Sequence, residues 1–307
     1  MGPPEMRVLL CLDGSARAEI ATELVANIDW PTNSTIRLVT VVSTPRTLFS
    51  TPWAPAAGGS AAQLEAELGA HGETLLEEGA RRLAGGGRSL ARLVLRGRPA
   101  STILEHAGDW PADLIVVGSR GHGPIATMLL GSVSAEVVEH ADCPVLVARQ
   151  PRLNRLVLAH DGSSHARRAE ELLSSWPIFE RAAVEVISVA PGGAAWRSNL
   201  APGIAAELED RGRLAEAALD QHRLIADEAA ARLRSTGLRA TSFIGQGDPA
   251  EAIIAAAEGS QADLIVTGSH GRTGVTRVLL GSVARNVTLH AGCSVLVARG
   301  PNPSEAG

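Results

Sequence analysis

The sequence contains no lysine, and each of its 28 basic residues is an arginine. A Walker A loop needs a lysine that contacts the β- and γ-phosphates of a nucleotide, so this absence excludes P-loop chemistry. It also excludes enzymes that form a Schiff base through a lysine amine. Any phosphate group that the protein holds has to be held by other donors.

Cysteine, clustered basic charge and long apolar runs are also scarce. The three cysteines form no CxxC pair, and the formal net charge is -5. Binding to nucleic acid rests on neutralisation of phosphates by clustered Lys and Arg, so it is not expected here. The chain shows no secretory signal and no apolar run of membrane-spanning length. We therefore expect a cytoplasmic protein that binds neither nucleic acid nor membrane.

What the sequence does contain is a long internal repeat. RVLLCLDGS at Arg7–Ser15 recurs as RLVLAHDGS at Arg155–Ser163, and DLIVVGSRG recurs later as DLIVTGSHG. The matching segments keep the same order in both halves. A repeat of this length indicates two duplicated domains rather than a solenoid of short units. We predict one domain at residues 1–150 and a second at residues 151–307.

Each half alternates strand-like and helix-like segments. Short apolar runs predict buried strands, and longer segments with one apolar face predict helices. In the first half, strands are expected at Arg7–Leu12, Ile36–Val42, Leu90–Leu95, Leu114–Val117 and Val145–Ala148, and helices at Asp13–Asn27, Ala61–Leu83, Ala100–Ala107 and Ser132–His140. The alternation is typical of parallel βαβ units. The predicted fold class is α/β, with two doubly wound domains.

A glycine pattern, G-x2-G-x9-G-S, follows the fourth strand of each half with identical spacing. Glycine lets a backbone approach phosphate oxygens closely and adopt positive φ. The free amides, the dipole and the serine hydroxyl at the start of the next helix favour an anion. The pattern predicts a phosphate site, and for a single copy an ordinary strand-to-helix turn is the alternative. The residues are Gly118, Gly121, Gly131 and Ser132 in the first half, and Gly268, Gly271, Gly281 and Ser282 in the second.

An aspartate follows the first strand of each half, as Asp13 and Asp161. Its carboxylate can accept a hydrogen bond from a ribose hydroxyl or a base amine, or hold water around Mg²⁺. Capping of the next helix, by this aspartate or by Ser15 in the first half, is the alternative. Ligands of doubly wound sheets lie where the strand order reverses. If strands one and four are neighbours, Asp13 and the Gly118 loop face each other across that crevice.

With these motifs, the whole chain resembles a tandem universal stress protein of the ATP-binding subfamily, over residues 5–150 and 153–300. The resemblance implies, in each domain, a five-stranded parallel sheet of order 3-2-1-4-5 with helices on both faces. It also implies an adenine nucleotide between strands one and four. The expected cofactor is ATP with Mg²⁺.

The resemblance assigns roles residue by residue. Adenosine contacts fall on Asp13 and Val41 in the first half and on Asp161 and Val189 in the second. For the two valines, burial inside a strand is an adequate alternative. Phosphate contacts fall on Gly118, Gly121, Gly131, Ser132 and Val133, and on Gly268, Gly271, Gly281, Ser282 and Val283.

The two loops differ between their shared glycines. Arg120 in the first loop corresponds to His270 in the second, and His122-Gly123-Pro124 corresponds to Arg272-Thr273-Gly274. The proline removes a backbone donor and stiffens the first loop. We expect two related sites that do not bind equally.

No nucleophile–base–orienter arrangement recurs, and neither half offers a convincing metal site, so we expect no catalytic residues and no metal ligands. The favoured function is an ATP-binding module of the stress response that acts through its conformation or through an unknown protein partner. A slow ATPase or phosphotransferase is the alternative function, and a flavin module is a third.

The resemblance also implies that the strands Val145–Ala148 and Val295–Ala298 pair with each other. The two domains would then form an intramolecular pseudo-dimer, with a homodimer possible.

Overall fold

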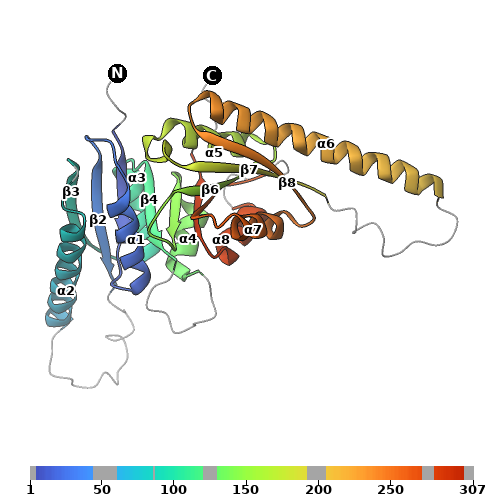
Figure 1. The fold of residues 1–307 in the computed structure, drawn as a ribbon. Coiled ribbons are helices and arrows are strands. Elements are labelled where there is room, and N and C mark those ends of the chain that lie inside the picture. The colour runs from blue at the N-terminus through green and yellow to red at the C-terminus, as the bar shows by residue number, and fades with distance from the viewer. Residues whose placement is uncertain are drawn as a thin grey trace, which may run out of the picture. The chain divides into compact units, whose positions relative to one another are not determined.

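The structure is a computed structural model that describes residues 5–43, 61–85, 87–119, 130–191, 205–271 and 280–300. The chain divides into two compact units, Met1–Pro151 and Arg152–Gly307. Strands and helices alternate along each unit (Figure 1). Each unit is therefore described by itself.

The first unit has one parallel sheet of order β3-β2-β1-β4-β5. Helices α1 and α2 pack beside each other on one face, and α3 and α4 pack beside each other on the other face. The strands are β1 (Arg7–Cys11), β2 (Thr35–Val42), β3 (Ser89–Arg96), β4 (Leu114–Gly118) and β5 (Val145–Ala148), and the helices are α1 (Ala16–Asn27), α2 (Ala61–Arg82), α3 (Pro99–Asp109) and α4 (Ser132–His140). The predicted fold class, strand order and two-faced helix cover are confirmed.

The second unit repeats this plan, with the order β8-β7-β6-β9-β10 in a parallel sheet. One short 3-10 helix, η2 (Pro177–Phe179), was not predicted. The strands are β6 (Arg155–Ala159), β7 (Ala183–Ala190), β8 (Arg239–Gln246), β9 (Leu264–Gly268) and β10 (Ser294–Ala298), and the helices are α5 (Ser164–Ser175), α6 (Ala205–Ser235), α7 (Pro249–Gly259) and α8 (Ser282–His290). The pairing of β5 with β10 stays a prediction.

Two strands of each unit are buried along their whole length. Every residue of β4, β5, β9 and β10 is buried, which explains why these segments read as continuous apolar runs. An aspartate at the start of β4 or β9 fixes the neighbouring strand. Asp113 Oδ2 accepts the amide of Arg7 at 2.7 Å, and Asp263 Oδ2 accepts the amide of Arg155 at 3.1 Å.

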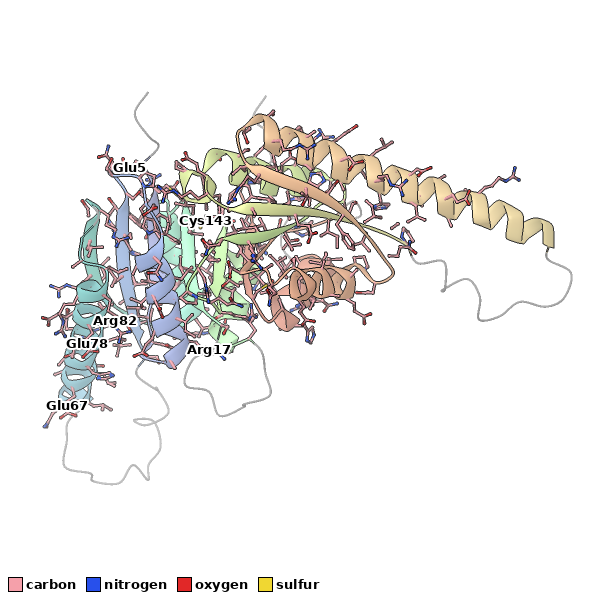
Figure 2. All side chains as sticks on the ribbon, viewed as in Figure 1. Glu5, Arg17, Glu67, Glu78, Arg82 and Cys143 are labelled. Atoms are coloured by element: carbon pink, nitrogen blue, oxygen red, sulfur yellow. The ribbon has the colours of Figure 1, made fainter. Side chains whose placement is uncertain are left out.

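The surface helix α2 shows why its sequence is amphipathic. Leu76 is fully buried, and Gly79 lies where an added Cβ would be 2.8 Å from Leu12 Cδ1. Charged side chains such as Glu67, Glu78 and Arg82 project into solvent (Figure 2).

Within the described part of the chain, no helix combines the length and the apolar character needed to cross a membrane.

A close approach of strand and helix sets the centre of each unit. A Cβ on Gly118 would lie 2.9 Å from the carbonyl carbon of Arg17 in α1. A Cβ on Gly268 would lie 2.6 Å from the carbonyl carbon of His165 in α5. Both distances are shorter than carbon atoms tolerate, so glycine is required where β4 and β9 meet the first turn of these helices.

We expect Gly268→Ala to lower the free energy of unfolding by about 1–3 kcal/mol, because overpacking forces the backbone to shift. Gly212→Ala is the matched control, since Gly212 lies inside α6 with no neighbour within 4 Å of an added Cβ. That change should raise stability by up to about 1 kcal/mol through helix propensity. Urea denaturation followed by circular dichroism compares them, and an unchanged midpoint for Gly268→Ala would contradict the close approach.

Candidate functional site

The turn after the first strand has the same construction in both units. Asp13 Oδ1 accepts the amide of Ser15, and Asp161 Oδ1 accepts the amide of Ser163, each at 3.0 Å. The glycine between them has positive φ, 77° at Gly14, which only glycine adopts readily. The serines cap the helices, because each Oγ accepts the amide three residues later. Of the two cap candidates in the first half, Ser15 is therefore the cap, and Asp13 shapes the turn that precedes it.

The glycine loop ends at the start of α4 or α8, with Gly131 or Gly281 as the residue that precedes the helix. The amide of Gly281 donates to the carbonyl of Ser269 at 2.8 Å. The next amides, of Ser282 and Val283, belong to the first helical turn, where no carbonyl of the helix can accept them. An anion bound here therefore meets the amides that follow Gly281, together with the positive end of the helix dipole.

The loop glycines serve close approach rather than unusual dihedral angles. None of the described ones, Gly118, Gly131, Gly268, Gly271 and Gly281, has positive φ, so the expectation of positive φ is wrong at these positions. A Cβ on Gly271 would lie 3.0 Å from Asp161 Oδ2, and one on Gly281 would lie 3.1 Å from His270 Cα. The missing side chains let the loop after β9 fold against the turn after β6.

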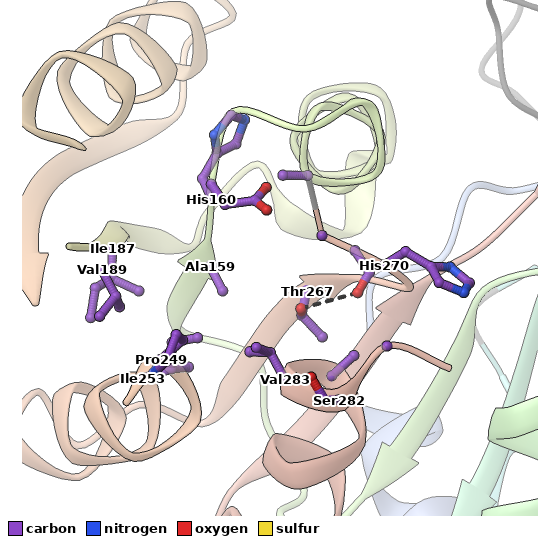
Figure 3. Close-up of a pocket in the computed structure, with 16 residues that line it drawn as sticks. Ala159, His160, Ile187, Val189, Pro249, Ile253, Thr267, His270, Ser282 and Val283 are labelled. Carbon is purple, nitrogen blue, oxygen red and sulfur yellow. Dashed lines mark hydrogen bonds between the residues drawn. The ribbon is translucent and has the colours of Figure 1, made fainter. Parts of the chain in front are cut away.

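A cavity of about 320 Å³ opens between these two segments in the second unit (Figure 3). This volume is at the lower end of the range for small-molecule sites. The lining contains all seven residues predicted for this half, namely Asp161, Val189, Gly268, Gly271, Gly281, Ser282 and Val283. The structure thus brings the whole predicted set together around one cavity, and their contact with a ligand stays a prediction.

The cavity has an apolar part and a polar part. Ile187 and Val189 from β7, and Ile253 from α7, supply aliphatic surface (Figure 3). The carboxylate of Asp161 and the hydroxyl of Ser282 stand with the loop glycines at the polar part. This division suits a ligand with a flat apolar group at one end and an anionic group at the other.

Sequence reasoning missed several residues of the lining. Pro249 and Ile253 lie in α7, which begins at Pro249. This helix forms one side of the cavity. Thr267 was missed because its first-half counterpart is Val117. Its Oγ1 donates to the carbonyl of Gly268 at 3.1 Å.

Two histidines lie beside the loop of the second unit. The rings of His165 and His270 are 5.0 Å apart, and both lie within 3.4 Å of the Ser269 hydroxyl. Burial lowers the pKa of His165, the neighbouring His270 lowers it further, and Asp161 acts in the opposite direction. His165 is therefore neutral at neutral pH, whereas its first-half counterpart is an arginine, Arg17.

The first unit places its matching residues on the same elements. Leu10 in β1 pairs with Val116 in β4, so the turn that carries Asp13 lies beside the end of β4 at Gly118. Val41 lies in β2, and Gly131, Ser132 and Val133 lie at the start of α4. Gly121, Arg120 and the segment His122-Gly123-Pro124 lie outside the described residues. The predicted inequality of the two loops therefore stays a prediction.

Metal and thiol chemistry find little support in the part of the chain that the structure describes. It contains no group of three or more His, Cys, Asp or Glu residues arranged to hold a metal ion. Cys11, Cys143 and Cys293 form no disulfide. Burial raises the pKa of the Cys11 thiol well above its usual range, with smaller contributions from Cys143 and Asp13. This thiol is therefore protonated and a poor nucleophile at neutral pH.

The sheet order, the paired turns and the cavity define a doubly wound α/β domain that occurs twice. A model of the universal stress protein family matches residues 6–149 and 153–299. The chain belongs to the universal stress protein family and carries two of its domains in tandem.

Individual relatives agree with this assignment. The chain is 32% identical over 210 residues to a universal stress protein of Mycolicibacterium smegmatis, which covers 61% of this chain and 62% of the relative. It is 32% identical over 212 residues to one of Mycobacterium tuberculosis, which covers 66% of each chain. The matches thus span somewhat less than two thirds of these relatives.

Solved structures show the same fold. A universal stress protein from Archaeoglobus fulgidus superposes with a TM-score of 0.67 at 20% identity, covering 96% of this chain and 98% of its own. A putative one from Pseudomonas aeruginosa gives a TM-score of 0.56 at 18% identity, covering 96% and 93%.

The lowered pKa of His165 predicts that its NMR titration midpoint lies below the ordinary value of 6.5. His270→Gln should raise that midpoint, because it removes the second cause of the shift. A depressed pKa means that the folded state binds the proton less readily than the unfolded state. The stabilisation is therefore present above the ordinary pKa and is lost as the pH falls through the folded-state pKa. A wild-type midpoint at or above the ordinary value would contradict this account.

Proposed function

We propose that the cavity of the second unit binds ATP, and that the first unit binds it through the matching residues. The observation that carries the proposal is the cavity lined by Asp161, Val189 and the three loop glycines, which the sequence had selected as a nucleotide site. Membership of the family and the resemblance of the motifs to its ATP-binding subfamily support the choice of ligand.

In the proposed arrangement, the adenine ring packs against the aliphatic surface of Ile187, Val189 and Ile253. The ribose hydroxyls donate to Asp161, whose carboxylate borders both the cavity and Gly271. Aliphatic walls provide the apolar contact that a purine face needs, and a carboxylate is the usual acceptor for sugar hydroxyls.

The phosphates are proposed to lie on the loop and the start of α8. The amides of Ser282 and Val283 and the helix dipole supply positive potential without a lysine. ATP would bring Mg²⁺ with it, coordinated mainly by phosphate oxygens. Asp161 is the carboxylate of the lining that can hold water around the ion.

We further propose that the protein binds ATP rather than turns it over. Among the described residues of the lining, Asp161 is the one carboxylate, and its Oδ1 already accepts the amide of Ser163. His160 and His270 are the other lining groups that could accept a proton from water, but neither recurs in the first half, where Leu12 and Arg120 occupy these positions. The proposal is a nucleotide-dependent module of the stress response in the cytoplasm, whose loop arrangement depends on bound phosphate. Multiple turnovers in a sensitive hydrolysis assay would favour the slow ATPase instead.

Calorimetry tests the site through Gly271→Ala. The new methyl would lie 3.0 Å from Asp161 Oδ2, so it should displace the carboxylate and weaken ATP binding at the second site about tenfold or more, equivalent to about 1.4 kcal/mol. Gly212→Ala, far along α6, should bind as the wild type does. Full affinity in Gly271→Ala would contradict the proposed place of the ribose.

A further inference from the structure

A buried chain of polar groups lies behind Asp161 in the second unit. His160 is the residue between β6 and Asp161, and its side chain is 1% exposed. Its Nδ1 accepts the amide of Gly162 at 3.2 Å. A ring nitrogen that accepts a hydrogen bond carries no proton, so the neutral ring bears its proton on Nε2.

The other side of the His160 ring faces an ion pair. Nε2 lies 3.1 Å from Glu170 Oε2, and the Glu170 side chain is 9% exposed. Arg232 of α6 binds the same carboxylate with two hydrogen bonds, of 2.7 and 2.9 Å. Burial raises the pKa of Glu170, but the close contacts with His160 and Arg232 outweigh it, so the net shift is downward and the carboxylate is ionised. His160 Nε2 lacks the alignment of a hydrogen bond to this carboxylate, so the contact is one of distance and charge, and the carboxylate itself is held between α5 and α6.

These contacts join two helices to the turn that carries Asp161. The turn leaves β6, Glu170 lies on α5, and Arg232 lies on α6. His160 is part of the cavity lining, but its ring points away from Ile187 and Val189 (Figure 3), and its two nitrogens face Gly162 and Glu170. The hydrogen bond from the Gly162 amide to His160 instead fixes the backbone at Gly162, whose φ is 83°.

The first unit has no such chain at the matching positions. Leu12 stands in place of His160, and Thr22 stands in place of Glu170. Arg82 corresponds to Arg232. Thr22 Oγ1 donates to the carbonyl of Ala18 in its own helix, and Arg82 lies 3.5 Å from Glu19 with both side chains mostly exposed. The same Asp-Gly-Ser turn therefore forms without polar support from behind.

We propose that His160 is a positioning residue that aims the Asp161 carboxylate at the ribose hydroxyls and makes the second site the stricter one for ribonucleotides. The inference rests on the proposed function. The Gly162 amide that His160 holds lies between Asp161 and Ser163, whose amide binds Asp161 Oδ1. Rotation of this peptide would move the amide of Ser163, and the carboxylate would follow.

Two substitutions separate the two ends of the ring. His160→Asn places a carbonyl oxygen near the position of Nδ1, so it can still accept the Gly162 amide. His160→Gln places its amide near the position of Nε2, so it can still reach Glu170 but leaves Gly162 without its acceptor. A merely structural role of the cluster would affect both variants in the same way.

The experiment titrates the full chain with ATP, 2′-deoxy-ATP and 3′-deoxy-ATP, and follows methyl NMR signals. Val189 and Val283 report the second site, and Val41 and Val133 report the first. The wild-type second site should prefer ATP over the weaker deoxy form by about tenfold, the scale of a hydrogen bond to a charged acceptor. This preference should persist in His160→Asn and fall to within about twofold in His160→Gln. The first site should keep its own ratio in every variant.

Each outcome bears on a distinct claim. Equal loss in both variants, or equal loss of ATP and deoxy-ATP affinity in His160→Gln, would overturn the positioning role. A wild-type second site that binds ATP without preferring the ribose would overturn it while leaving the proposed function intact. A second site that binds no nucleotide would overturn the proposed function itself. Nitrogen-15 NMR of the wild type adds a test without substitution, because a His160 ring protonated on Nδ1 would also overturn the inference.

Discussion

Each unit depends on a close contact between the end of one strand and the backbone in the first turn of a helix. In the second unit, the strand is β9 and the helix is α5. The contact exists because Gly268 has no side chain. This contact brings the loop after β9 beside the turn after β6, and the cavity lies between the two. The equivalent contact of Gly118 with α1 gives the first unit the same framework.

This constraint also explains how a chain without lysine can offer a phosphate site. The glycines keep the loop backbone close to the turn and to the start of α8, where helical amides point outward. Binding strength then comes from the backbone and the helix dipole, and selectivity comes from side chains at the edge. Asp161 is the main one, and its Oδ2 stands against Gly271 because that residue also lacks a Cβ.

The sequence predicted most of the fold, because the repeat presented each pattern twice. The buried strands β4 and β9 were read from their apolar runs, and the order of strands followed from the family resemblance. The sequence did not reveal why the loop glycines that the structure describes are there: none of them has positive φ, and Gly118, Gly268, Gly271 and Gly281 instead allow close packing. Periodicity reports local conformation, whereas such packing depends on segments far apart in the chain.

Part of the site could also be predicted because its motifs occur twice in the sequence. Residues of the two repeated motifs could be chosen from their spacing, and in the second unit all seven line the cavity. Ile253 looked like an ordinary core residue of a helix, and His160 broke the repeat as a single change from Leu12. The role of His160 depends on Glu170 and Arg232, which approach it only in the folded chain.

The central claim is that this lysine-free framework holds ATP. Mass spectrometry of the small molecules released from the purified, denatured protein tests it most directly. The account predicts intact ATP in a fixed ratio to the chain, reduced by Gly271→Ala. Release of no nucleotide, together with no heat of ATP binding to the same preparation, would contradict it.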